Sequence, residues 1–255
     1  MPYFIILILV LVVLGILVWM KKSQNHLAIL GIAFIVGISI FALFFWQSRQ
    51  AATSLRVVGY ASKLFESDLV KWNLSFSKNV ETTELSSGYK GMSSDLKAFQ
   101  NYLSAQGIPE DDQSVMPVTS FPRHDNYGNM VGYTLNQSIT VLSEDLEKIG
   151  ELSLNPDFFA ERGMVLQNSN LEYLYTKLPE LKQQLLSEAT SDALARATEI
   201  SGSAKTKLGK LQEARAGVFQ ITEPYSTDVS DYGIYNTGTR KKSISVTLTA
   251  VFKLR

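Results

Sequence analysis

The stretch SISVTLTAVFKL, residues 243–254, alternates polar and apolar side chains, with Val251 as the one exception. Successive side chains of a β-strand point to opposite faces of the sheet, so this period of two predicts a strand with one buried face. Ser and Thr fill most of the other face. The apolar positions are Ile244, Val246, Leu248, Ala250, Phe252 and Leu254.

Other segments repeat this pattern with different clarity. The segments 71–77 and 133–143 alternate in the same way, and they predict two more long strands that each have one buried face. Weaker patterns predict further strands near residues 55–61, 113–121, 164–174 and 213–222.

Two long helices are expected between these strands. In residues 82–106 the apolar side chains recur at intervals of three and four, and the pattern stops at Gly107, a residue that commonly ends helices. In residues 177–202 the apolar stripe changes from leucine to alanine, which allows close packing. A short amphipathic helix is expected at 144–152.

These elements predict an α+β domain over residues 55–255, in which a mainly antiparallel sheet carries the two long helices on one face. Each half of the domain has a long helix, a glycine, a strand, a connection rich in glycine and aromatic residues, and an alternating strand. This order indicates an internal duplication of a helix-plus-hairpin unit. The two connections are residues 121–132 and 223–240.

The first 46 residues differ in kind from the rest. Residues 3–20 and 27–46 carry no charge, and each is long enough as a helix to cross the hydrocarbon core of a bilayer. A buried core helix or a cleaved signal peptide is the alternative, but the chain starts with MPYF and lacks the basic start of signal peptides. We expect residues 1–46 to form a transmembrane helical hairpin, and residues 47–54 to form a linker.

Four residues are expected at the membrane interface. Trp19 and Trp46 close the two apolar runs, and Lys21 and Lys22 lie in the turn between them. The distribution of positive charge does not decide which side the domain occupies, because basic residues lie on both sides of the second run. Those that follow it are Arg49, Arg56 and Lys63.

The stretch SGSAKTKLGKL, residues 201–211, contains glycines, lysines and a GK pair, as a phosphate-binding loop does. Such a loop needs the pattern GxxxxGK followed by Ser or Thr, after a strand and before a helix. Here Gly202 and Gly209 enclose six residues, Leu211 stands where the hydroxyl should be, and a helix comes first. We interpret the stretch as the end of that helix and a solvated turn.

Nothing else in the sequence predicts catalysis, a cofactor or a metal site. The chain has no cysteine, which excludes thiolate chemistry. Of its two histidines, His26 lies in the predicted membrane turn, and His124 with Asp125 supplies too few ligands for zinc. Residues 47–255 hold 24 acidic and 22 basic residues, so the charge favours no nucleic-acid partner.

The connection 223–240 is a candidate for contact with another protein. It carries Tyr225, Tyr232 and Tyr235, and rigid aromatic rings in a Gly- and Asn-containing loop suit such contacts. Loops of this length are uncommon unless they are functional or disordered. The sequence leaves open whether this one is a contact surface or a flexible hairpin tip.

A second candidate contact lies on the helix at 82–106. Gly88 and Gly91 each destabilise a helix relative to alanine, which indicates that a small residue is needed at these positions for another purpose. With Ala98 they form a face of small residues that would let a neighbouring helix approach closely. We expect this face to contribute to contacts between copies of the chain.

From about residue 55 to 254 these features also carry a resemblance to a known family. The segments concerned are RVVGYASKLFESDLVKWNLSFS at 56–77, YLSAQGI at 102–108, ATSDALARATEISGSAKTKLGKL at 189–211 and KKSISVTLTAVFKL at 241–254. In these segments the chain resembles the SIMPL-domain family of bacterial envelope proteins. The family's pattern also interprets residues 201–211 as a helix end leading into a strand.

The resemblance implies an α+β sandwich, export to the periplasm or outer envelope, no established enzyme activity, and assembly into large hollow homo-oligomers shaped like rings or barrels. The predicted double-spanning hairpin departs from the single signal or anchor segment common in the family. Together they imply an inner-membrane protein whose termini and folded domain lie in the periplasm, with the KKSQNH turn, residues 21–26, inside.

We therefore expect a membrane-anchored, non-catalytic protein whose partners are further copies of itself and the lipid bilayer. A periplasmic sensor or binding module that signals through the hairpin is the alternative. A hydrolase that uses His124 or a carboxylate at a cleft is a third hypothesis.

Overall fold

The computed structural model describes the backbone of residues 26–49 and 54–255, and the side chains of residues 31–46 and 54–255. The chain divides into two units at residues 53 and 54. In the first unit, helix α2 spans His26–Arg49. The predicted apolar run at 3–20 lies outside the described residues.

Among the residues that the structure describes, no helix is both long and apolar enough to cross a membrane. Of the four residues predicted at a membrane interface, Trp46 is described, and its side chain is 65% exposed on α2. The other three, Trp19, Lys21 and Lys22, lie outside the described residues.

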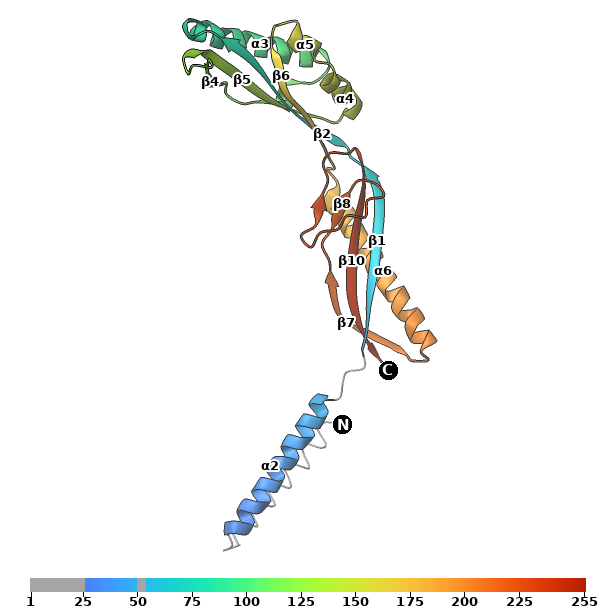
Figure 1. The fold of residues 1–255 in the computed structure, drawn as a ribbon. Helices are drawn as coiled ribbons and strands as arrows, with labels where there is room; N and C mark the ends of the chain where they lie inside the picture. Colours follow the sequence, from blue (N-terminus) through green and yellow to red (C-terminus); the bar gives the residue numbers. More distant parts are fainter. Residues whose placement is uncertain (1–25, 50–53) are drawn as a thin grey trace. The chain divides into compact units, whose positions relative to one another are not determined.

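The second unit contains two five-stranded sheets (Figure 1). The strands of sheet A are β1 (Ser54–Glu66), β7 (Leu208–Ala216), β8 (Gln220–Thr222), β9 (Ile234–Tyr235) and β10 (Lys241–Leu254). Strand β10 lies at the centre and pairs antiparallel with β1 on one side and with β7 and β8 on the other. Strand β9 adds to β8 in parallel. Helix α6 (Leu178–Ser203) packs along β1 and β10.

Sheet B is wholly antiparallel. Its strands are β2 (Leu69–Val80), β3 (Gln113–Val115), β4 (Thr119–His124), β5 (Met130–Ser143) and β6 (Val165–Leu174). Its helices are α3 (Leu85–Ala105), α4 (Leu146–Leu154) and α5 (Asp157–Ala160), with the short 3-10 turns η1 (Thr82–Glu84) and η2 (Glu110–Asp112). The three α-helices cover one face of this sheet (Figure 1).

The predicted α+β class is confirmed, but the arrangement differs from the expected single sheet with both long helices on one face. Helix α3 covers sheet B and helix α6 covers sheet A, and each pair has its own hydrophobic core. An alternating strand shows that one of its faces is buried, but the pattern does not show which helix covers that face. The sequence therefore predicts the elements without their pairing.

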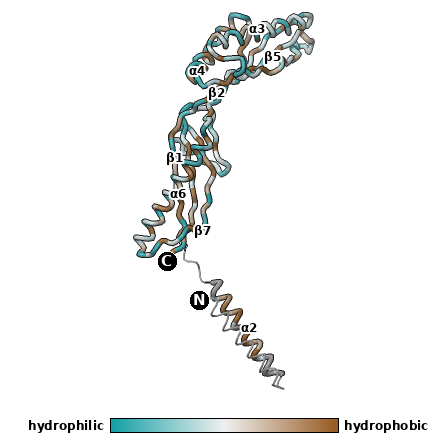
Figure 2. The backbone as a smooth tube through the Cα atoms, turned by 180° about the vertical axis from the view of Figure 1, so that it is seen from behind, coloured by the Kyte–Doolittle hydropathy of each residue, from teal (hydrophilic) through white to brown (hydrophobic). Residues whose placement is uncertain are grey.

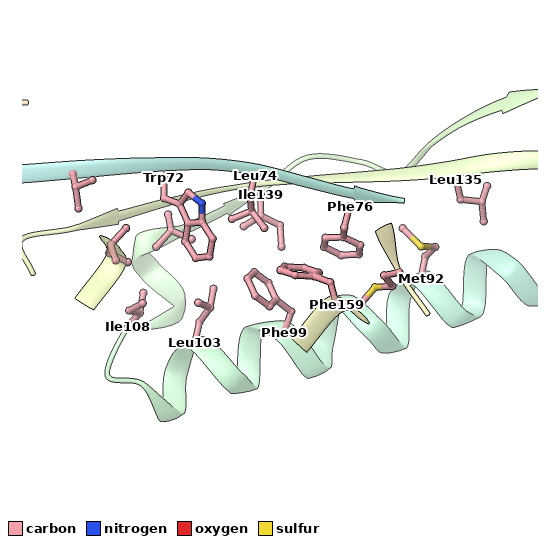
Figure 3. Close-up of a cluster of buried hydrophobic side chains, with 14 of the residues drawn as sticks. Trp72, Leu74, Phe76, Met92, Phe99, Leu103, Ile108, Leu135, Ile139 and Phe159 are labelled. Atoms are coloured by element: carbon pink, nitrogen blue, oxygen red, sulfur yellow. The ribbon is translucent and has the colours of Figure 1, made fainter. Parts of the chain in front are cut away.

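The core of sheet B is aromatic (Figure 3). The ring of Phe99 from α3 contacts rings from β2 and α5, with ring centroids 6.2 Å from Trp72, 6.3 Å from Phe76 and 5.0 Å from Phe159. Rings at these distances and tilted angles attract one another beyond their buried area. The Trp72 indole N–H donates to the Ser169 hydroxyl at 2.9 Å, so this buried polar group is satisfied.

The core of sheet A depends on small residues. Ala189, Ala193 and Ala197 form the buried stripe of α6, and all three are fully buried. Opposite them on β1 is Gly59, where an added Cβ would lie 2.7 Å from the Ala193 backbone nitrogen and 2.8 Å from the Ala193 Cβ. Helix and strand therefore approach so closely that no side chain larger than hydrogen fits at residue 59.

The chain passes between the two sheets at neighbouring points. At the turn from β1 to β2, the Asp68 amide donates to the Leu174 carbonyl at the end of β6. The Asp68 carboxylate accepts hydrogen bonds from the amide and the hydroxyl of Thr176, both at 2.7 Å. These bonds join the two crossing segments side by side.

The topology agrees with the predicted duplication. Strands β5 and β10 are the two long alternating strands, and each has one long antiparallel neighbour, β2 or β1, on one side. On the other side each has two short strands, β3 and β4 or β7 and β8. The two halves are interleaved in the chain, because β1 precedes sheet B and yet belongs to sheet A.

Both hydrophobic cores are built entirely from residues between Leu55 and Phe252. Residues 54–255 thus contain every core residue of the second unit and form one compact unit, so we expect this fragment to fold by itself.

We predict that Gly59→Ala destabilises this fragment by about 2–3 kcal/mol or more, because the added methyl group forces α6 away from β1. Gly91→Ala is the matched control, since nothing lies within 4 Å of a Cβ at that helical position. It should leave stability unchanged or raise it by up to about 1 kcal/mol. Urea unfolding measures both, and equal effects of the two substitutions would refute the close-packing account.

Candidate assembly surface

Helix α6 covers one face of sheet A and leaves the opposite face open. On β1, residues that alternate with the buried Val57 and Ala61 point to the open side. Three of them are large and about half exposed: Val58 at 49%, Tyr60 at 50% and Leu64 at 57%. Val58 and Tyr60 are neighbours on this face and Ser62 separates them from Leu64; exposed apolar side chains that gather in this way often mark contacts with proteins.

The outer edge of β1 is closed at its middle. The Tyr60 amide donates to the Asp192 carboxylate of α6 at 2.8 Å, and Arg196 donates to the same oxygen at 2.8 Å. The Tyr60 N–H, and after it the Arg196 guanidinium, hold the pKa of Asp192 below its usual value. An unpaired strand edge invites another strand, and this carboxylate occupies the donor that such a strand would need.

The connection 223–240 is anchored to sheet A at several points. The Gln220 side chain donates to the Ser230 carbonyl at 2.7 Å and accepts from the Ser230 amide at 3.3 Å. The Asn236 amide donates to the Ile221 carbonyl, and the Tyr173 amide of sheet B donates to the Thr237 carbonyl. Of the two interpretations left open by the sequence, these bonds favour a defined loop over a flexible hairpin tip.

Tyrosine side chains project from this anchored loop. Tyr225 is 90% exposed and Tyr232 is 97% exposed, while Tyr235 lies on β9 and is 48% exposed. Tyr225 has a φ of 66°, in the left-handed region that a bulky residue seldom adopts. The loop thus presents two nearly free aromatic rings.

A groove of about 530 Å³ runs between this loop and the open face of sheet A. Tyr60 of β1, Thr247 of β10, Val218 and Val229 are among the residues that line it. Val229 is 81% exposed. We define the open-face surface as Val58, Tyr60, Leu64, Val229, Tyr225 and Tyr232.

The small residues of α3 lie in different environments. Gly88 is buried, and a Cβ there would lie 2.7 Å from Val80 and 3.0 Å from Leu135. The close approach that Gly88 allows is thus between α3 and its own sheet, so Gly88 is not placed to contact another copy. Gly91 and Ala98 are partly exposed, and space is open beside Gly91.

The open face of sheet B is polar. Neighbouring strands are joined by side-chain hydrogen bonds: Thr140 donates to Asn73 at 2.9 Å, and Asn73 donates to Glu172 at 2.7 Å. At one end a hollow of about 510 Å³ is lined by residues that include Phe121, Arg123 and Asn136. Within the described residues, the buried Asn136 Oδ1 has no hydrogen-bond partner.

The residues considered for catalysis have structural roles or are isolated. His124 ends the exposed strand β4, and the Asp125 carboxylate accepts from the amides of Tyr127 and Asn129 in the following turn. The Asn129 side chain, which also donates to it, contributes most to lowering the pKa of Asp125. Among the described residues no group of three metal-ligating side chains could hold an ion.

The stretch at 201–211 is a helix end that leads into a strand. Helix α6 ends at Ser203 and β7 begins at Leu208, so the order of elements is the reverse of that in a phosphate loop. Lys205, with a φ of 55°, adopts the left-handed conformation in the turn that follows the helix.

One buried side chain was not predicted. Lys242 at the start of β10 is 2% exposed, and its ammonium donates to the Ser67 hydroxyl and the Tyr173 carbonyl, both at 3.0 Å, and to the Thr239 carbonyl. It therefore ties together the β1–β2 turn, the end of β6 and the connection 223–240. Burial lowers the pKa of Lys242 from 10.5 to about 8.

Charged groups near Lys242 are engaged elsewhere. Arg240 forms ion pairs with Glu66 and Glu147, and Asp68 is bonded to Thr176. The sequence KKSIS gave no sign that the second lysine is buried, because lysine at a strand start is normally solvated.

Residues 55–252 match the SIMPL family, which is described as protein of unknown function (DUF541). The chain belongs to the SIMPL family. No curated protein matches it. The matched residues include both cores of the SIMPL domain and the whole connection 223–240.

We predict that Lys242 makes the SIMPL domain gain stability between pH 8 and pH 10. Below pH 8 the Lys242 amine is protonated in both the folded and the unfolded chain. The burial of its charge then lowers the stability of the folded domain in full. Between pH 8 and 10.5 the unfolded chain keeps a proton that the folded chain has released, so stability rises with pH, by roughly 1–3 kcal/mol.

Urea unfolding of wild type and Lys242→Met at pH 7, 8, 9 and 10 tests this, because other titrating groups cancel in the difference. The free energy of unfolding of the wild type, relative to that of the variant, should increase as the pH rises. A difference that stays constant over this range would contradict a buried lysine with a lowered pKa.

Proposed function

We propose that this SIMPL protein is a membrane-anchored, non-catalytic envelope protein that assembles into a large ring-, barrel- or cage-like homo-oligomer. The observation that carries the proposal is the open-face surface. Val229, which is 81% exposed, lines a groove together with Tyr60 of β1, and the loop that carries Val229 also presents Tyr225 and Tyr232, each at least 90% exposed. Burial against another copy would remove this surface from water.

The loop suits repeated contacts between identical chains. Its aromatic rings offer large contact area at a low cost in conformational entropy, and its hydrogen bonds hold it in place before any partner arrives. Pre-ordered aromatic side chains are the usual source of binding energy in protein interfaces. Gly91 and Ala98 of α3 are a secondary contact in this proposal.

The sequence supports the membrane anchor. Residues 3–20 and 27–46 are free of charge. Apart from Ser39, the described side chains of α2 are apolar, as in Phe34, Leu43 and Phe44, and Figure 2 colours much of this helix as hydrophobic. A helix that is apolar all round suits a lipid or a protein interior. Within the proposal, both termini and the SIMPL domain lie on the periplasmic side of the bacterial inner membrane.

A periplasmic sensor or binding module is the second candidate. The polar hollow on sheet B favours it, since an exposed arginine, an amide oxygen without a partner and the ring of Phe121 meet there. Such groups suit a small polar ligand. This function predicts a monomer or dimer whose thermal stability rises when a ligand is added.

We predict that the double substitution Tyr225→Asn and Tyr232→Ser shifts the full-length protein to smaller particles. Asparagine is chosen at residue 225 because it tolerates the left-handed backbone there. Each lost aromatic anchor weakens every copy of the interface by about 1 kcal/mol or more. Mass photometry of detergent-extracted protein measures the particle sizes.

Tyr127→Ser is the matched control. Tyr127 is 91% exposed, but it lies in the β4–β5 turn of sheet B, away from the loop. Urea unfolding should show all variants folded with similar stability. The role given to the loop fails if the double variant keeps the wild-type particle mass, or if Tyr127→Ser lowers it equally.

A further inference from the structure

The end of sheet A at which β1 begins is strongly basic. Ser54 of β1 pairs with Lys253 of β10, and Leu254 pairs with Leu208 of β7. Backbone hydrogen bonds in both directions join Lys207 to Arg255. The first residues of β1, the α6–β7 turn and the C-terminal residues therefore meet at one end of the domain (Figure 1).

We define the basic end as Arg56, Lys205, Lys207, Lys210, Lys253 and Arg255. All six are exposed, and none forms an ion pair with the described part of the chain. The acidic side chains nearest in sequence are Glu199 and Glu213, and Glu213 is paired with Arg215. The six positive charges are thus almost uncompensated.

The opposite end of sheet A is acidic. Glu66 ends β1, and a hollow there is lined by Glu66, Asp68, Glu144, Asp145 and Glu147 together with Arg240. The 13 residues of β1 separate the two ends, a distance of about 40 Å. The domain as a whole is close to neutral, so the positive charge of the basic end is balanced by acidic side chains elsewhere in the domain.

The basic end is also the end attached to the apolar helix. Helix α2 ends at Arg49 and β1 begins at Ser54. The intervening four residues span at most about 17 Å when fully extended. If α2 is inserted in a membrane, this short connection by itself keeps the basic end close to the membrane surface.

We propose that the basic end binds the anionic phospholipid headgroups of the membrane in which the chain is anchored. Positive charges close to an anionic bilayer are attracted by its surface potential, which falls off within about a Debye length, so the distant acidic hollow does not oppose this attraction. The SIMPL domain then stands on the membrane with sheet A roughly upright and its acidic end away from the lipid. This inference rests on the proposed membrane anchor.

The test uses the fragment 54–255, which contains both cores, and vesicles of phosphatidylcholine with or without 30 mol% phosphatidylglycerol. Flotation should show binding to the anionic vesicles at low salt, weaker binding at high salt, and none to the neutral vesicles. The triple variant Lys205→Gln, Lys207→Gln, Lys210→Gln should bind on the order of a hundredfold more weakly, at about fivefold for each lysine.

The matched control is Lys90→Gln, Lys97→Gln, Lys177→Gln, which removes three exposed lysines from elsewhere in the domain. It should bind as the wild type does, and circular dichroism should show both variants folded. The proposal is overturned if the wild-type fragment ignores the anionic vesicles, or if the two triple variants lose binding equally.

A separate measurement distinguishes failure of the anchor. Full-length protein, with and without the Lys205, Lys207 and Lys210 substitutions, is washed in alkaline carbonate, which strips proteins held by charge alone. Retention of both in the membrane pellet supports the anchor independently of headgroup binding. Release of both overturns the anchor, and with it the inference, whatever the vesicles show.

Discussion

The close contact between α6 and β1 at Gly59 determines which surfaces of sheet A remain free. Ala189 and Ala193 of the helix lie directly on the glycine, so the helix axis sits over the edge strand. This position brings Asp192 to the Tyr60 amide and closes the strand edge at its middle. The face opposite the helix is left open, and the connection 223–240 is the element that borders it.

This constraint bears on how copies of the chain could meet. Pairing of β1 edges would require the Tyr60 N–H to leave a charged acceptor, which is a strong hydrogen bond to give up. Face-to-face or loop-mediated contacts need no such exchange. The proposed assembly therefore uses the open-face surface, and the junction of Lys242 with Ser67, Tyr173 and Thr239 fixes the loop to both sheets.

Much of the fold could be predicted from the sequence, because strict alternation and regular apolar stripes are local signals. The strands β2, β5 and β10 and the helices α3 and α6 follow from them. The pairing of each helix with its sheet could not be predicted. An apolar stripe on a helix indicates that this side is buried, but it does not indicate which sheet covers it. Gly88 is a further example. Its small size correctly indicated a close approach, but the segment that approaches is sheet B of the same chain and not a helix of another copy.

Of the candidate contact residues, Tyr225 and Tyr232 could be found from composition and loop length alone, and the structure places both at the surface. The side chains and backbone groups that anchor this loop could not be predicted, because they come from distant positions in the sequence. Gln220 and Tyr173 look ordinary in the sequence, and Lys242 looks solvated. Polar residues acquire such roles only when the fold brings an acceptor to them.

The most direct test of the central claim is the particle mass of the detergent-extracted full-length protein, by mass photometry with negative-stain images. The account predicts a discrete species of many subunits with a hollow centre. A monomer or dimer that persists across detergents would contradict self-assembly and would favour the binding-module function of sheet B.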